Sequence, residues 1–118
     1  MSLNKSVLIV DDSRLSRMMI NKIVSTYHPD WSISEAVSAD QALNLCNEQQ
    51  YDFITLDNNM PGMSGLDAYP LLRTRQPSAK IGLFTANIQK SIQERCKQEG
   101  VIFVEKPITE ERVANFFS

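Results

Sequence analysis

Five polar side chains could do chemistry together in this sequence, because each one follows a short apolar run. They are Asp11, Asp12, Asp57, Thr85 and Lys106. Short apolar runs of this kind are typical of strands that are buried on both faces of a parallel sheet. The carboxyl ends of parallel strands share one edge, which is where open α/β sheets bind ligands. We therefore expect these five side chains to lie within reach of one another.

The charges in this group point to a divalent cation and to phosphoryl transfer. Three converging carboxylates repel one another, and leaving them unpaired is costly. Mg²⁺ removes that cost, since it binds a few carboxylates together with water and phosphate oxygens. Asp57 could then act as a nucleophile, because carboxylates form aspartyl phosphates. Lys106 and the metal would stabilise the transferring group, while Thr85 adds a hydroxyl donor.

Each of these residues also has an ordinary structural explanation. Asp12 could cap the following helix, and Asp57 and Thr85 could be turn residues at strand ends. Lys106 could be a surface charge. We favour a functional explanation, because all five residues would otherwise have to lie at one edge of the sheet by chance.

The elements that must position these side chains alternate along the chain. Strands are predicted at residues 6–10, 31–36, 53–56, 80–84 and 101–104. The second of them has the weakest pattern and is a candidate edge strand. Helical patterns follow each strand, and this alternation predicts an α/β fold with a five-stranded parallel sheet and helices on both faces.

Local signals predict where the helices begin and which faces they bury. The candidate caps are Ser13, Ser38 with Gln41, Ser64 with Asp67, Asn87, and Thr109. Gly100 is expected to end the fourth helix. Pro70 lies past the first turn of the third helix, so we expect a kink or a delayed start there. Apolar residues at helical spacing predict the buried faces of the first helix (Leu15, Met18, Met19, Ile23, Val24, Tyr27) and of the fourth (Ile88, Ile92, Cys96).

Composition limits the functional classes. The 118 residues suit one domain, spanning 1–118, and the content of 42% hydrophobic and 22% charged residues is that of a globular protein. A formal net charge of -2 predicts no general affinity for nucleic acid or for an anionic membrane surface. The sequence has no apolar run long enough to span a bilayer and no signal-peptide pattern, so we expect a cytoplasmic location. Cys46 and Cys96 lack metal-ligand spacing and are interpreted as reduced packing residues.

As a set, these motifs resemble those of response-regulator receiver domains, the CheY-like phosphoacceptors of two-component signalling. The resemblance covers residues 5–117. It depends on Val10-Asp11-Asp12, Asp57 with Met60-Pro61-Gly62 and Ser64-Gly65, Thr85-Ala86, and Lys106-Pro107. It implies a flavodoxin-like fold with strand order 2-1-3-4-5, and a signalling switch rather than an enzyme.

The resemblance also implies a role for each site residue. Asp57 would be the phosphoacceptor that becomes 4-aspartylphosphate. Asp12 and Asp57 would bind Mg²⁺ (or Mn²⁺) directly, together with the backbone carbonyl of Asn59, while Asp11 would act largely through water. Lys106 would pair with the phosphoryl group.

Further expectations about the switch, the backbone and the partners follow from the same resemblance. Thr85 would contact the phosphoryl group and move on phosphorylation, and Phe103 matches the aromatic switch position. The bond between Lys106 and Pro107 would be cis. A histidine kinase or a histidine phosphotransfer protein would donate the phosphoryl group. A downstream protein or output domain would bind the fourth helix, fifth strand and fifth helix, with no direct nucleic-acid binding and no membrane insertion.

Three residues depart from the usual receiver pattern. Phe103 stands where tyrosine is common, so a hydroxyl is missing there. Asn58 replaces the usual apolar residue after the phosphoacceptor, and we expect it to loosen the end of the strand. Pro70 is unusual in the third helix.

Two other functions were weighed against a receiver. A small Mg²⁺-dependent aspartyl phosphatase of the haloacid-dehalogenase type shares the nucleophilic Asp, the Thr and the Lys. Such enzymes carry a second Asp two residues after the nucleophile, where this chain has Asn59, and their nucleophile follows the first strand. A degenerate scaffold that is never phosphorylated is the other alternative, and the complete acid set argues against it.

Overall fold

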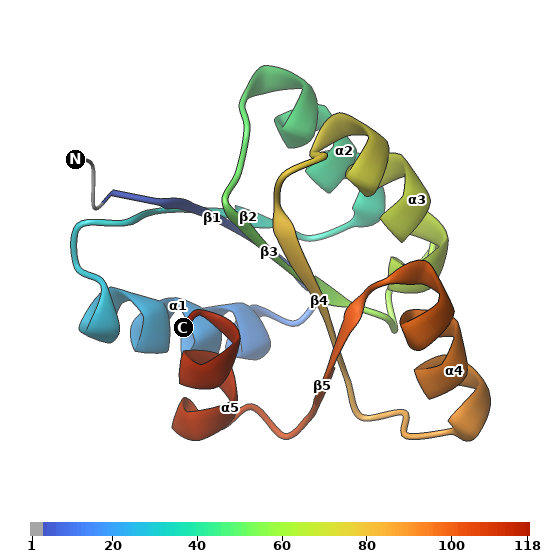
Figure 1. Cartoon of the computed structure of the whole chain (residues 1–118). Coiled ribbons are helices and arrows are strands. Elements are labelled where there is room, and N and C mark those ends of the chain that lie inside the picture. The colour runs from blue at the N-terminus through green and yellow to red at the C-terminus, as the bar shows by residue number, and fades with distance from the viewer. Residues whose placement is uncertain (1–3) are drawn as a thin grey trace.

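A five-stranded parallel sheet runs through the centre of the computed structural model, which describes residues 4–118 (Figure 1). The strands are β1 (Ser6–Val10), β2 (Ser32–Ala36), β3 (Phe53–Asp57), β4 (Lys80–Thr85) and β5 (Ile102–Glu105). Their order is β2-β1-β3-β4-β5, which confirms the expected flavodoxin-like topology and places β2 at an edge. Because β3 is central, Asp57 lies between the ends of β1 and β4.

Helices cover both faces of the sheet, as predicted. They are α1 (Arg14–Tyr27), α2 (Ala39–Glu48), α3 (Gly65–Arg75), α4 (Lys90–Glu99) and α5 (Glu110–Phe116). Figure 1 shows α1 and α5 together on one face, and α2, α3 and α4 on the other. Within β1, Val7 and Ile9 pack toward the α1 and α5 layer, whereas Leu8 and Val10 pack toward the opposite layer. This burial on both faces explains why the strands appear in the sequence as continuous apolar runs.

Four of the predicted helix caps are confirmed. Each cap oxygen accepts a hydrogen bond from the amide three residues later, and the caps are Ser13, Ser38, Ser64 and Thr109. Gly100 ends α4 with φ +78°, a conformation that glycine adopts without steric cost.

The predicted cap of α4 is wrong. The helix begins at Lys90 after Gln89, and Asn87 forms an earlier turn in which its Oδ1 accepts from the Gln89 amide at 3.0 Å. Ile88 therefore precedes the helix and is exposed rather than buried. Cys96 is buried and Ile92 packs partly against the core, so the rest of the predicted inner face is correct.

The predicted buried face of α1 is also partly wrong. Leu15, Met18 and Met19 are exposed, and so is Tyr27, while Ile20 and Val24 face the sheet. The polar side chains Ser16 and Arg17 lie one turn before Ile20 and are half-buried. Arg17 takes this position because it donates to Glu35 Oε1 at 2.9 Å and to the Asp11 carbonyl at 2.8 Å. Apolar periodicity alone gives no sign of these polar contacts.

Pro70 does not delay α3, so of the kink or delayed start that the sequence predicts, the delayed start is wrong. The helix begins at Gly65 and continues through Pro70 to Arg75. Proline only removes one amide, the donor that would otherwise bond to the carbonyl of Leu66 four residues earlier. That carbonyl accepts instead from Arg95 Nη2 of α4 at 3.2 Å.

Candidate functional site

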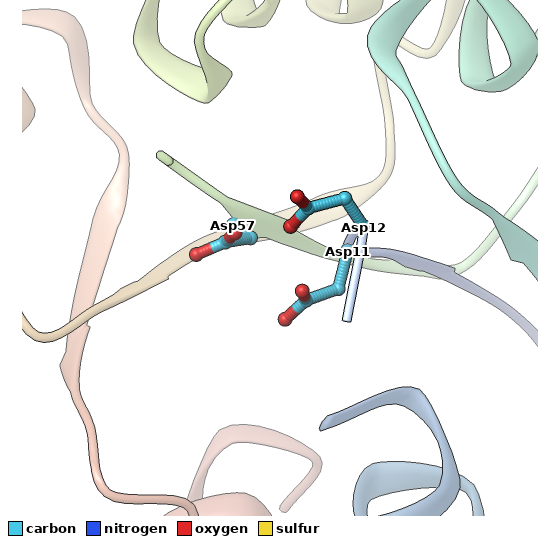
Figure 2. A group of neighbouring side chains, drawn as sticks. All are labelled: Asp11, Asp12 and Asp57. Carbon is cyan, nitrogen blue, oxygen red and sulfur yellow. The ribbon is translucent and has the colours of Figure 1, made fainter. Parts of the chain in front are cut away.

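Three carboxylates converge at the carboxyl ends of β1 and β3. Asp11, Asp12 and Asp57 each offer an oxygen, and these oxygens lie within 4.8 Å of one another. Figure 2 shows the three side chains close together at the ends of the two strands. The pairing of Val10 with Leu56 produces this arrangement, because it brings the next residue of each strand to the same level of the sheet.

The Asp11 side chain is oriented from both sides. It is 2% exposed, its Oδ1 accepts from the Ser13 amide at 2.9 Å, and its Oδ2 accepts from Lys106 Nζ at 3.1 Å. Asp12 is exposed to solvent. The two neighbouring acids therefore differ, since one is fixed in the protein and the other is free to meet an incoming ligand.

Lys106 links the acids across the sheet. Its Nζ lies 3.1 Å from Asp11 Oδ2 and 3.2 Å from Asp57 Oδ1. Its backbone amide donates to the Thr85 carbonyl at 2.9 Å, which holds the end of β5 against β4. The Lys106–Pro107 peptide bond is cis, as the resemblance implies.

The surroundings of Asp57 disfavour its charge. The pKa of Asp57 is raised to about 6, first by burial and then by the neighbouring Asp11 carboxylate, while Lys106 opposes the rise. Burial alone would lower the pKa of Lys106. The hydrogen bond and charge of Asp11, together with the charge of Asp57, outweigh burial, so the pKa of Lys106 is raised above its ordinary value. The Lys106 ammonium therefore lies between the buried carboxyl groups of Asp11 and Asp57. It does not fully offset the cost of a negative charge on Asp57.

This arrangement predicts a pH dependence of stability. The folded chain binds the Asp57 proton more tightly than the unfolded chain, with a pKa of about 6 against an ordinary value of about 3.9. Between pH 4 and 6 folding therefore takes up a proton, and this contribution to the unfolding free energy falls as pH rises. We expect a loss of about 2 to 3 kcal/mol across this range in metal-free protein.

Denaturant unfolding with a chelator present, at pH 4.5 and at pH 7, checks this prediction. The Asp57→Asn variant is the control, because it lacks the titrating group while the other acids remain. The wild type should lose more stability than the variant between the two pH values. Equal losses would contradict the assigned protonation of Asp57.

The residue after Asp57 tightens the loop instead of loosening it. Asn58 is 9% exposed, its carbonyl accepts from the Gly65 amide at 3.2 Å, and its Oδ1 accepts from the Leu66 amide at 3.0 Å. The expectation that Asn58 loosens the strand end is therefore wrong. Gly65 allows the close approach, since a Cβ there would lie 2.4 Å from the Asp57 carbonyl oxygen.

The remaining predicted site residues lie around this cluster. Thr85 is fully buried, and its Oγ1 accepts from the Asn87 amide at 3.1 Å. Asn59 lies exposed in the loop after β3. Phe103 is partly buried in β5, beside Leu83 of β4.

The donor set fits a hard divalent cation. All three groups are carboxylates, which Mg²⁺ prefers, and opposite ligands of a Mg²⁺ ion lie about 4.2 Å apart, close to the spread of these oxygens. The raised pKa of Asp57 shows that Lys106 alone does not compensate the acids. Asp11, Asp12 and Asp57 could therefore hold such an ion, and the sequence had indicated all three.

The comparisons with known proteins agree on one family. The family model described as "Response regulator receiver domain" matches residues 7–117. The chemotaxis protein CheY of Listeria monocytogenes is 34% identical over 109 residues, covering 91% of this chain and 90% of that protein.

Two solved structures share the fold. A response regulator protein from Burkholderia pseudomallei, with a phosphorylated aspartic acid, calcium ion and citrate, superposes with a TM-score of 0.87 at 23% identity, covering 97% of this chain and 66% of that one. The complex of CheX and CheY with BeF3 and Mg²⁺ from Borrelia burgdorferi gives 0.86 at 23% identity, with 96% and 86% covered.

Proposed function

The chain belongs to the response regulator receiver domain family, and we propose that it is the phosphoacceptor of a two-component phosphorelay. The observation that carries this proposal is the buried Asp57, which shares Lys106 with Asp11 and lies beside the exposed Asp12. We propose that Asp57 accepts a phosphoryl group from a histidine kinase or a histidine phosphotransfer protein. The domain assignment over residues 1–118 is part of this proposal.

In the proposed reaction, an Asp57 oxygen attacks the phosphorus of the donor's phosphohistidine. The new P–O bond forms as the P–N bond breaks, and the imidazole leaves with the electron pair and takes up a proton. Lys106 Nζ already contacts Asp57 and would turn to a phosphoryl oxygen. The buried Thr85 would donate its hydroxyl to another phosphoryl oxygen.

A bound Mg²⁺ (or Mn²⁺) would supply positive charge for the phosphoryl oxygens. Asp12 and Asp57 would hold it directly, with the carbonyl of Asn59, and Asp11 would contribute largely through water. The Burkholderia structure contains a phosphorylated aspartic acid and a calcium ion, and the Borrelia complex contains Mg²⁺, which supports a metal requirement here.

Loss of Asp12 is expected to weaken Mg²⁺ binding by at least about tenfold without unfolding the protein. Asp12 is exposed and contributes little to packing, so Asp12→Asn should change the charge of the site alone. Mg²⁺ binding shows as a rise in melting temperature with metal concentration, since a ligand that binds only the folded state stabilises it.

The matched control is Asp40→Asn, which removes an exposed acid from the first turn of α2. It should keep the wild-type response to Mg²⁺. An Asp12→Asn protein with that same response would contradict the proposed metal site.

The phosphoryl group would act as a switch. We propose that Thr85 moves toward it and that Phe103 turns inward into the space that Thr85 leaves, which changes the surface formed by α4, β5 and α5. A downstream protein or output domain would read that surface. In the Borrelia complex the partner of CheY is CheX, which supports regulation by protein binding.

Phosphatase activity is the alternative from another functional class. Receiver domains are signalling phosphoacceptors, and the residue two positions after Asp57 is Asn59 rather than a general acid. With a generic phosphomonoester and Mg²⁺ we expect almost no turnover. Sustained turnover that disappears in Asp57→Asn would favour the phosphatase, and no adduct with any donor despite Mg²⁺ binding would favour a degenerate scaffold.

No helix within residues 4–118 has both the length and the apolarity needed to cross a membrane. A cytoplasmic location goes with the proposed signalling role and stays a prediction.

A further inference from the structure

Asn58 and Ser64 together bond the amides that begin α3. The first four amides of a helix have no partner within it. Asn58 accepts from the Gly65 and Leu66 amides, through its carbonyl and its Oδ1. Ser64 accepts from the next two amides through its Oγ and its carbonyl. Half of this helix start therefore depends on the residue that directly follows Asp57.

The carbonyl of Leu66 accepts a hydrogen bond from α4 rather than from its own helix. Pro70 lacks the amide that would reach it, and Arg95 Nη2 of α4 donates to it at 3.2 Å. The same nitrogen lies 3.2 Å from Asp67 Oδ1, and Arg95 Nε lies 2.6 Å from Glu99 Oε2. Glu99 thus holds the guanidinium on α4, while its free end bonds to the first turn of α3.

We infer that Arg95 is a positioning residue that couples α4 to the phosphoacceptor loop through the peptide groups of Leu66. The amide of Leu66 donates to Oδ1 of Asn58, the neighbour of Asp57. The carbonyl of Leu66, in the next peptide group, accepts from Arg95. The inference rests on the proposed function and deepens it, because it names a contact through which a change at Asp57 reaches α4. Since α4 belongs to the proposed partner surface, Arg95 affects how strongly that surface responds.

This coupling explains two departures from the usual receiver pattern. An apolar side chain at position 58 could not accept from the Leu66 amide. A residue with an amide at position 70 would share the Leu66 carbonyl with Arg95 and so weaken the bond that Arg95 makes there. Asn58 thus bonds the Leu66 amide to the phosphoacceptor loop, and Pro70 leaves the Leu66 carbonyl to Arg95 of α4.

A surface ion pair is the simpler explanation for Arg95. Its side chain is 41% exposed, and exposed pairs with acids contribute little. The bond to the carbonyl of Leu66 differs, because that residue is 1% exposed and a charged donor strengthens the bond. The two explanations diverge when Pro70 is replaced, since only the carbonyl bond depends on the proline.

Hydrogen exchange of the α4 amides in the unphosphorylated protein separates these explanations. Arg95→Met should speed exchange across α4 by about fivefold relative to the β1 amides, the effect of losing one hydrogen bond. Arg75→Met is the matched control, because Arg75 bonds to the Leu71 carbonyl of α3 and to Asn47 of α2, away from α4. It should leave α4 exchange unchanged.

The Pro70→Ala background gives the decisive comparison. Alanine restores an amide that also donates to the Leu66 carbonyl and weakens the bond from Arg95, so adding Arg95→Met should then change α4 exchange by less than about twofold. A surface ion pair predicts the same factor in both backgrounds, and that result, or no effect of Arg95→Met in the wild-type background, would overturn the inference.

Asn58→Leu tests the other half of the path. It removes the acceptor of the Leu66 amide and should speed α4 exchange in the wild-type background but not in Arg95→Met. Equal effects in both backgrounds would overturn the coupling. Because no phosphoryl group is used, failure here leaves the proposed function standing, whereas absence of an acyl phosphate on Asp57 contradicts the proposed function alone.

Discussion

Replacing Lys106 by Met is expected to lower the unfolding free energy of the metal-free protein by about 4 kcal/mol at pH 7. Lys106 Nζ is the cation bonded to both Asp11 and Asp57, which are 2% and 5% exposed. Methionine keeps much of the side-chain volume and removes the charge, so two buried carboxylates remain with nothing to offset their repulsion. Breaking a buried pair from one side is costly for this reason.

The pH and metal dependence identify the cause of that loss. Without Lys106 the pKa of Asp57 should rise further, because Lys106 is the group that opposes its rise. Lowering the pH to 5 would then protonate Asp57, and adding Mg²⁺ would supply another cation, so both should reduce the loss. Denaturant unfolding measures it under each condition.

Lys90→Met is the matched control for this prediction. Lys90 pairs with Glu94 at 3.8 Å on the surface, where both side chains are largely exposed. Its removal should change stability by no more than about 0.5 kcal/mol. A Lys106→Met protein that behaved like this control at pH 7 would contradict the electrostatic description of the site.

The second large effect is expected from Gly65→Ala, which should destabilise the protein by at least about 3 kcal/mol. A Cβ at this position would lie 2.4 Å from the Asp57 carbonyl oxygen and 3.0 Å from Leu83 Cδ1. The closest atom belongs to the backbone of the central strand and cannot rotate away. Either α3 or the end of β3 must shift, and a shift of β3 also moves the nucleophile.

Gly100→Ala provides the comparison for Gly65. Gly100 has φ +78°, and a Cβ added there would meet nothing within 4 Å, so its substitution should cost only about 1 kcal/mol of conformational strain. Thermal or denaturant unfolding of both variants tests the difference. A Gly65→Ala loss no larger than that of Gly100→Ala would show that the contact with Asp57 is unimportant.

The sheet and the acid cluster could be predicted from the sequence for a clear physical reason. Strands buried on both faces must be apolar along their whole length, so β1 and β3 stand out from the polar residues at their ends. Parallel pairing then brings Asp11, Asp12 and Asp57 to the same edge without further information. The strand order itself came from the family resemblance.

Apart from the cap of α4, where Asn87 forms a local turn, the errors arose where polar tertiary contacts override local patterns. Arg17 occupies the inner side of α1 because Glu35 and the Asp11 carbonyl bind it, and Met18 faces solvent as a result. The bond between Arg95 and Leu66 joins helices that are 29 residues apart in sequence, and the bond between Asn58 and Leu66 crosses the loop between β3 and α3. One local signal was available: Pro70 inside a helix always frees one carbonyl, but the sequence does not say which side chain takes it.

The intact mass of the protein after treatment with a small phosphodonor and Mg²⁺, beside the Asp57→Asn variant, tests the central claim most directly. Our account predicts one labile phosphoryl adduct on the wild type and none on the variant, because Asp57 is the carboxylate placed beside Lys106 and the acid cluster. An adduct on both proteins at the same rate, or on neither although Mg²⁺ binds, would contradict it.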